Sequence, residues 1–220
     1  MSIRPYLIPF AIAAAAVSLT RPAMAERAIV APVPALSIAS TASSETAIFA
    51  GGCFWGVEGV FEHVRGVTGA VSGYTGGTTQ RPDYDAVSGG ATGHAEAVRV
   101  TFDPRVVRYS DLLRIYFSVV ADPTTLNYQG PDHGTQYRTA LFPTSTAQER
   151  QARAYLVQLR AARVFRAPIV TRIESVRGFN VAEGYHQDYM RKNPNAGYIV
   201  ANDRPKVDAL RRLFPKSYRG

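Results

Sequence analysis

The chain contains a single cysteine, Cys53, and its neighbours favour a reactive thiol. It lies in the string Gly-Gly-Cys-Phe-Trp-Gly at 51–56, between a short apolar run and a segment with helical periodicity. A thiol in the first turn of a helix faces unpaired backbone N–H groups and the positive end of the helix dipole. We therefore predict a nucleophile with a lowered pKa. The alternative is a buried structural cysteine, which the flanking glycines and aromatic residues disfavour.

The thiol alone does not define the reaction, because a thiolate attacks carbonyls, disulfides and sulfoxides. A cysteine hydrolase needs a histidine base. His63 falls about ten residues along the same helix and is remote from Cys53, so His94 and His133 are the candidate bases. The sequence has no close-spaced pair of Cys or His ligands, so we expect no metal and no other cofactor.

Glu96 is the second candidate for chemistry. The alternation across 94–102 places it on the strand face that carries the bulkier apolar residues. Desolvation on such a face raises the pKa of a carboxyl group, and a nearby thiolate raises it further. Glu96 is therefore expected to donate a proton. The alternatives are exposure at a sheet edge or an ion pair with Arg99 or Arg138.

The elements that must position these residues alternate between strands and helices. We expect strands at 46–50, 67–74, 94–102, 135–142 and 168–175, and helices at 53–64, 110–120, 147–162, 182–191 and 205–213. Ser110 and Ser145 are the expected N-caps of two of these helices. Long loops at 75–93 and 122–134 separate the elements, and loops of that length are usually functional. The pattern predicts an α+β fold with one sheet and its helices.

The N-terminal residues have the features of an export signal. Residues 1–25 combine Arg4, an apolar stretch at 6–19 and a small-x-small sequence at 23–25. The alternative is an uncleaved anchor. Residues 26–46, rich in Ala, Ser and Pro, are expected to form a flexible leader, and 47–220 to form one domain. We therefore predict export, to the bacterial periplasm or an equivalent compartment.

The charge is basic but dispersed. The chain has 25 Lys and Arg against 17 Asp and Glu, a formal charge of +8. Its arginines are spread over many segments, so the sequence does not indicate nucleic-acid binding. A single cysteine leaves no internal disulfide, and the fold must depend on its core. A non-catalytic module that binds methionine-rich or acidic partners remains an alternative to an enzyme.

Five strings resemble motifs of the A-class peptide methionine sulfoxide reductases, in the family's order. They are Gly-Cys-Phe-Trp-Gly-Val-Glu at 52–58, Gly-Tyr-Thr-Gly-Gly at 73–77, Gly-His-Ala-Glu-Ala-Val at 93–98, Gly-Pro-Asp-His-Gly-Thr-Gln-Tyr-Arg at 130–138 and Tyr-His-Gln-Asp-Tyr at 185–189. The resemblance extends from about residue 47 to the C-terminus. It implies a central mixed sheet flanked by helices around a ferredoxin-like split β-α-β core. It also implies reduction of the S epimer of methionine sulfoxide, free or in proteins.

By this resemblance Cys53 is the nucleophile and Glu96 the acid. Reduction of a sulfoxide requires attack on sulfur while the oxygen gains protons, so a thiolate facing a neutral acid fits the reaction. The chain lacks the recycling cysteines that many members carry near the C-terminus. Cys53 would then remain a sulfenic acid after turnover. We expect a monomer that needs a thioredoxin-like protein or a small thiol as external reductant.

The resemblance also assigns the residues that bind the substrate. Tyr84, Asp132 and Tyr137 correspond to the groups that hydrogen-bond around the sulfoxide oxygen. Phe54 and Trp55 correspond to the apolar wall that holds the ε-methyl group, where ring faces and apolar area both contribute. The sequence has Pro131 where many members have Asn, and the proline removes a backbone donor from the loop that presents Asp132.

Overall fold

Six strands form one mixed sheet in the order β7-β6-β1-β3-β2-β8. The computed structural model describes residues 28–220. The strands are β1 Glu45–Gly51, β2 Val67–Thr75, β3 Ala95–Phe102, β6 Thr139–Phe142, β7 Arg172–Ile173 and β8 Asn180–Val181. Neighbouring strands are antiparallel except β6 and β7. The central order β6-β1-β3-β2 is that of a ferredoxin-like split β-α-β core, which confirms the predicted fold class.

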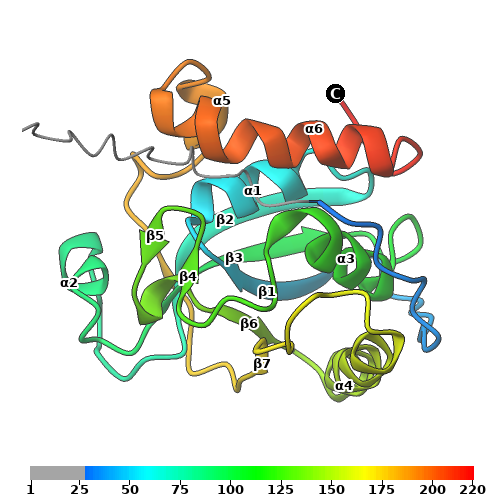
Figure 1. Cartoon of the computed structure of the whole chain (residues 1–220). Coiled ribbons are helices and arrows are strands. Elements are labelled where there is room, and N and C mark those ends of the chain that lie inside the picture. The colour runs from blue at the N-terminus through cyan, green and yellow to red at the C-terminus, as the bar shows by residue number, and fades with distance from the viewer. Residues whose placement is uncertain (1–27) are drawn as a thin grey trace, which may run out of the picture.

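Helices cover one face of this sheet most heavily. They are α1 Phe54–Glu62, α2 Tyr84–Ser88, α3 Tyr109–Ile115, α4 Thr146–Ala162, α5 Tyr189–Lys192 and α6 Arg204–Leu213. Two wider π-helical turns, Tyr116–Val120 and Ile199–Asp203, continue α3 and precede α6. In Figure 1, α1 lies over the sheet and α6 lies across α1 on the side away from the strands. Because α1 follows β1 directly, the start of α1 lies at the C-terminal end of β1, one of the two central strands.

The two faces of the sheet carry different side chains. Phe49 of β1 stacks on Phe61 of α1 at 4.7 Å and on Tyr116 at 5.6 Å, in the large core between sheet and helices. The strand residues of the opposite face, mainly alanines, form a smaller cluster against which Phe179 packs. Glu96 shares the parity of Val98, so it points to the helix-covered face as predicted.

The two long loops contain short elements that the sequence did not predict. The first holds α2, capped by Asp83, whose side chain accepts from the Ala86 N–H at 2.8 Å. The second folds into a hairpin of β4 Tyr128–Gln129 and β5 Asp132–His133. A side-chain cap stabilises α2, and a two-residue turn stabilises the hairpin. Such elements have no periodic pattern of apolar residues in the sequence, so they were not predicted.

Several predicted boundaries are wrong. The strand predicted at 135–142 begins as a 3₁₀ turn at 135–137, and the one at 168–175 pairs only at 172–173. The helix predicted at 182–191 is helical only from 189. The N-cap of α3 is Arg108 instead of Ser110, because Asp111 accepts from the Arg108 N–H. Ser145 caps α4 as predicted and accepts from the Gln148 N–H at 3.2 Å.

Residues 28–38, which we call the N-terminal strap, are not the flexible leader that composition predicted. Ala31 is fully buried, and its N–H donates to Ser118 Oγ at 3.0 Å. Tyr155 of α4 donates to the Pro32 carbonyl at 2.6 Å, and Gln151 accepts from the Ile38 N–H at 3.0 Å. Side chains of α4 and of the π-helical turn after α3 thus satisfy backbone groups of the strap, which local composition does not reveal.

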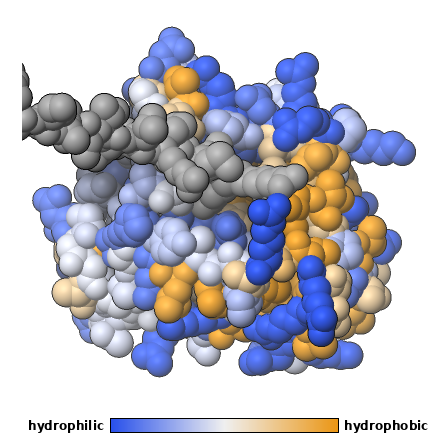
Figure 2. All heavy atoms as spheres, in the orientation of Figure 1, coloured by the Kyte–Doolittle hydropathy of each residue, from blue (hydrophilic) through white to orange (hydrophobic). Residues whose placement is uncertain are grey.

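The predicted signal sequence at 1–25 lies outside the described residues. Between residues 28 and 220, the structure has no helix both long enough and apolar enough to cross a membrane. On the face shown in Figure 2, hydrophobic residues gather on the right, where Figure 1 shows the strap and α3. Val30 and Val33 of the strap are 53% and 64% exposed.

A buried carboxyl group on α1 gives a first prediction, on stability. Glu58 is 2% exposed and accepts from the Asp188 N–H at 3.0 Å. Burial, with the charge of Glu62, raises its pKa to about 7. The folded state therefore holds a proton that the unfolded state loses near pH 4.5, so Glu58 costs stability progressively as pH rises towards 7 and fully above it.

Glu58→Gln keeps an oxygen acceptor for Asp188 and removes this charge. We expect its free energy of unfolding to exceed that of the wild type by about 1–2 kcal/mol at pH 8 and to differ little at pH 4.5. Urea denaturation at both pH values measures the difference. Glu149→Gln, in an exposed ion pair, is the matched control. A gain of equal size at both pH values would contradict the raised pKa.

Candidate active site

Cys53 lies at the junction of β1 and α1, as its sequence context predicted. It is the N-cap residue of α1 and is 8% exposed. The preceding Gly52 has φ +86°, and a Cβ there would lie 2.6 Å from Cβ of Gln129. Only glycine fits this turn, and the loop that carries β4 packs directly against it. The loop therefore lies against the turn that precedes the thiol.

The pKa of Cys53 is not lowered, which corrects the prediction from its place on the helix. Burial raises the pKa well above the ordinary value, and the nearby carboxyl groups of Glu96, Asp203 and Asp132 raise it further. A hydrogen bond with the Trp55 backbone lowers the pKa of Cys53 but does not offset these increases. Desolvation and like charge outweigh the helix terminus here, so the thiol is neutral at neutral pH.

Glu96 is the buried acid that the strand parity predicted. It is 2% exposed, and its Oε2 accepts from the Phe54 N–H at 2.9 Å. Burial raises its pKa to about 8, with Asp132 and Asp203 adding to the effect. Glu96 is therefore protonated at neutral pH and able to donate.

The alternative of an arginine partner for Glu96 is wrong. Arg138 instead makes two 2.9 Å hydrogen bonds to Glu174, and Arg99 lies over the ring of Phe179 at 4.8 Å. Both guanidinium groups are occupied on the opposite face of the sheet or at its edge. No compensating positive charge therefore lowers the pKa of Glu96.

Asp132 reaches the site on the β4–β5 hairpin. Gly130 and Pro131 form its turn, and Gln129 pairs with Asp132 across it. Pro131 occupies a turn position, so its missing N–H leaves the pairing intact. Asp132 accepts a hydrogen bond from the Tyr198 hydroxyl. Burial raises the pKa of Asp132, and that hydrogen bond opposes the increase.

Tyr84 and Tyr137 approach the same place from two other segments. Tyr84 begins α2, and its backbone N–H donates to Glu183 Oε1 at 2.9 Å. Tyr137 ends the 3₁₀ turn that precedes β6. Burial raises the pKa of both hydroxyls, and both also respond to the charges of Glu96 and Cys53. These two tyrosines therefore surround the thiol together with Glu96 and Asp132.

Of the two aromatic residues after Cys53, Phe54 is buried and Trp55 is partly accessible. Phe54 is 1% exposed and packs against the rings of Tyr74 and His186. Trp55 is half-buried, stacks on Tyr189 at 3.8 Å and donates from Nε1 to His186 Nδ1 at 3.1 Å. Trp55 is thus the more accessible ring of the two, and both rings pack against His186.

Three residues near the site were not identified from the sequence as part of it. Asp203 is fully buried, and a Cβ at Gly56 would lie 2.2 Å from its Oδ1, so the glycine in α1 makes room for the carboxyl group. Tyr198 and Asp203 enter from the π-helical turn Ile199–Asp203 and its preceding residue. His186 belongs to the string at 185–189, but nothing in that string alone indicated its bond to Trp55.

The two histidines predicted as candidate bases, His94 and His133, are engaged elsewhere. His94 uses both ring nitrogens, with the Gly77 N–H at 3.3 Å and the Thr79 carbonyl at 2.8 Å. His133 is exposed and stacks on Tyr128 at 5.2 Å. Within residues 28–220, no group of three or more His, Cys, Asp or Glu side chains is placed to hold a metal ion. The geometry favours an acid partner for the thiol over a histidine base.

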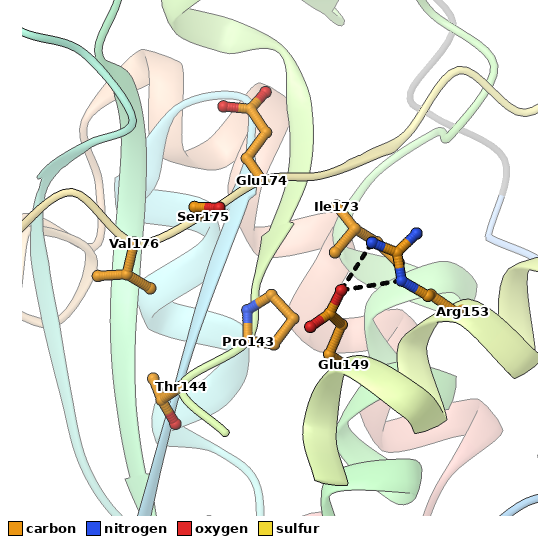
Figure 3. A pocket seen from close by; sticks show the side chains of 8 residues that line it. All are labelled: Pro143, Thr144, Glu149, Arg153, Ile173, Glu174, Ser175 and Val176. Atoms are coloured by element: carbon orange, nitrogen blue, oxygen red, sulfur yellow. Dashed lines mark hydrogen bonds and ion pairs between the residues drawn. The ribbon is translucent and has the colours of Figure 1, made fainter. Parts of the chain in front are cut away.

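A separate cavity of about 390 Å³ lies between the end of β6, α4 and β7. Figure 3 shows the Glu149–Arg153 ion pair of α4 on one side of it and Ser175 and Val176 on the other. None of the residues around Cys53 lines this cavity. Its carboxylates are already held by arginines, so it offers no reactive group comparable with the site at α1.

The neutral thiol gives a second prediction, on reactivity. Each unit of pKa increase lowers the thiolate fraction about tenfold at neutral pH. We expect Cys53 to react with iodoacetamide at pH 7.5 at least about tenfold more slowly than free cysteine, as measured by intact mass. The same protein unfolded in guanidinium chloride, the control, should react at the ordinary rate. A native rate equal to the unfolded one would contradict the raised pKa.

The chain is similar in sequence to proteins of known family. The family model described as peptide methionine sulfoxide reductase matches residues 45–218. A peptide methionine sulfoxide reductase MsrA 2 of Mesorhizobium japonicum is 56% identical over 175 residues, which cover 80% of this chain and 90% of the relative. An MsrA of Deinococcus radiodurans is 55% identical over 173 residues, covering 79% and 84%.

Solved structures give the same result. The reduced form of Mxr1 from Saccharomyces cerevisiae is 32% identical, with a TM-score of 0.63 over 74% of this chain and 92% of that one. Methionine sulfoxide reductase A of Corynebacterium diphtheriae is 31% identical, with a TM-score of 0.60 over 79% and 92%. Both relatives and structures extend over nearly the whole described domain. The chain belongs to the peptide methionine sulfoxide reductase family.

Proposed function

We propose that Cys53 and Glu96 carry the reaction by which this peptide-methionine (S)-S-oxide reductase converts methionine sulfoxide to methionine. The observation that supports this most directly is a protonated carboxyl group buried beside the only thiol. As the Cys53 sulfur attacks the sulfoxide sulfur, negative charge develops on the oxygen; Glu96 gives its proton to that oxygen, and the proton of the neutral Cys53 thiol passes to the Glu96 carboxylate. The neighbouring tyrosine hydroxyls donate hydrogen bonds to the same oxygen and stabilise its developing charge.

Four other side chains bind the substrate in this proposal. The hydroxyls of Tyr84 and Tyr137 donate to the sulfoxide oxygen, and Asp132, held by Tyr198, fixes the opposite side of the site. The indole of Trp55 packs on the ε-methyl group, which becomes electron-poor as the sulfur is attacked. The Trp55 ring is fixed by Tyr189 and His186 before substrate arrives, which lowers the ordering cost of binding.

One protein thiol is sufficient for the catalytic cycle when an external reductant is present. One Cys53 thiol and one sulfoxide give one sulfenic acid and one thioether, so the oxygen passes from methionine to Cys53. Two external thiols then reduce the sulfenic acid to the thiol and release water and a disulfide. The sequence has no second cysteine, so the reductant comes from outside the chain. A thioredoxin-like dithiol or a small thiol meets this requirement.

We also propose that the enzyme is an exported monomer that repairs oxidised proteins. The basic residue, apolar stretch and small-x-small sequence within residues 1–25 support export. The natural substrates would then be methionine sulfoxide residues in proteins of the periplasm or an equivalent compartment.

Glu96→Gln tests the acid. We expect kcat/KM for S-methionine sulfoxide, with dithiothreitol as reductant, to fall on the order of 10²–10⁴-fold. Wild-type activity should decline above about pH 8 as Glu96 loses its proton, and the variant should lack this decline. Glu174→Gln, which changes a carboxylate away from the site, is the control. Equal turnover of the S and R epimers, or a fully active Glu96→Gln, would overturn the proposal.

Intact mass tests the single-cysteine cycle. With one equivalent of S-methionine sulfoxide and no reductant, the protein should gain one oxygen atom, and dimedone should trap it as a sulfenic acid. Cys53→Ser, the matched control, should show neither change nor any turnover. Release of methionine from a protein of unchanged mass would contradict a Cys53 sulfenic acid.

A further inference from the structure

Two hydrogen bonds join the segment that carries Tyr84 to the segment that carries Tyr137. Both donors are side chains directly before Tyr137, and both acceptors are backbone carbonyls at or just after the end of α2. Gln136 Nε2 donates to the Ser88 carbonyl at 2.9 Å, and Thr135 Oγ1 donates to the Gly90 carbonyl at 3.3 Å. The two tyrosine-bearing segments are therefore bound directly to each other.

Gln136 is the buried member of this pair of donors. It is 4% exposed, whereas Thr135 lies at the surface. A Cβ at Gly134 would collide with Oε1 of Gln136, and a Cβ at Gly90 would lie 3.3 Å from the same atom. Both glycines have positive φ, +134° and +78°, so the backbone on both sides leaves room for the carboxamide.

Stability alone does not account for a glutamine at this position. The Oε1 atom of Gln136 is buried and has no hydrogen-bond partner within residues 28–220. A buried polar atom without a partner costs stability, and an apolar side chain of similar length would avoid that cost. The amide group that remains useful is Nε2, which binds α2.

The helix α2 depends on contacts of this kind for its position. It has five residues, of which only Val87 is buried, and so short a helix is not stable by itself. Figure 1 shows α2 at the edge of the molecule, apart from the other helices. Glu183 holds its first residue through the Tyr84 N–H, and Gln136 holds its last residue, Ser88.

We propose that Gln136 is a positioning residue that sets the Tyr84 hydroxyl relative to the Tyr137 hydroxyl, so that both donate to one sulfoxide oxygen; this rests on the reductase mechanism above. Gln136 is adjacent to Tyr137 in the chain, and the Ser88 carbonyl that it binds is one helical turn from Tyr84. The two hydroxyls are close enough for Tyr84 to raise the pKa of Tyr137. Donors that converge on one atom lose most of their effect when displaced by about 1 Å.

Gln136→Met tests this role, because it removes the donor and keeps the length of the side chain. We expect the single-turnover rate of methionine release at saturating S-methionine sulfoxide to fall about tenfold, less than the 10²–10³-fold loss that follows outright removal of a transition-state donor. The half-saturating substrate concentration should change little, because the hydroxyls bind the developing charge more strongly than the ground state. Gln151→Met is the matched control: Gln151 is also buried, binds the N-terminal strap, and should keep the wild-type rate.

The same substitution in Tyr84→Phe/Tyr137→Phe separates positioning from a general effect on the fold. Without hydroxyls to position, Gln136→Met should lower the single-turnover rate less than about twofold. A residue that only maintains the fold would give the same loss in both backgrounds. Gln136→Asn keeps a carboxamide but is one methylene too short to reach Ser88, and it should show the same dependence on background if the methionine variant does not fold.

Equal losses in the two backgrounds, or full single-turnover rates for Gln136→Met and Gln136→Asn, would overturn positioning by Gln136 and leave the reductase function intact. A Tyr84→Phe/Tyr137→Phe variant as fast as the wild type would instead overturn the proposed role of the two tyrosines. Failure of the wild type to release methionine would overturn the proposed function itself.

Discussion

The hydrogen bond from the Phe54 N–H to Glu96 joins the first turn of α1 to the middle of the sheet. It satisfies one of the donors that a helix start leaves open, and it does so with an acid instead of a capping hydroxyl. The same contact holds a carboxyl group beside Cys53 in a buried setting. Position, burial and protonation state of both groups therefore depend on how closely α1 approaches β3.

That close approach needs small residues at defined places. Gly52 allows the loop with Gln129 to lie against the turn before Cys53, and Gly56 leaves room for the Asp203 carboxyl group. Side chains there would separate α1 from its neighbours and admit water. Because the raised pKa values of Cys53 and Glu96 come first from desolvation, the glycines maintain the chemistry as well as the packing.

Sequence reasoning succeeded where one local pattern determines the outcome. The period of two in β3 fixed the face of Glu96, and the helical period after Cys53 located α1. It failed where residues distant in the chain decide. The pKa of Cys53 is raised by burial and by the charges of Glu96 and Asp203, the latter 150 positions away. The strap is held by side chains of the π-helical turn Tyr116–Val120 and of α4. The motif strings identified the region of Asp132, but Tyr198 has no local signal that links it to that carboxylate.

Both π-helical turns border the site. Tyr116 opens the first and donates to the Ala50 carbonyl at 2.7 Å, three residues before Cys53, and the second ends at Asp203. A π turn contains one residue more than an α turn, so it shifts the angular phase of the residues before it by about 100° relative to those after it. Without the extra residue in Ile199–Asp203, α6 could keep its packing on α1 only if Tyr198 left Asp132. The register of a helix on the protein's outer layer thus sets the orientation of the Tyr198 hydroxyl near the Cys53 thiol.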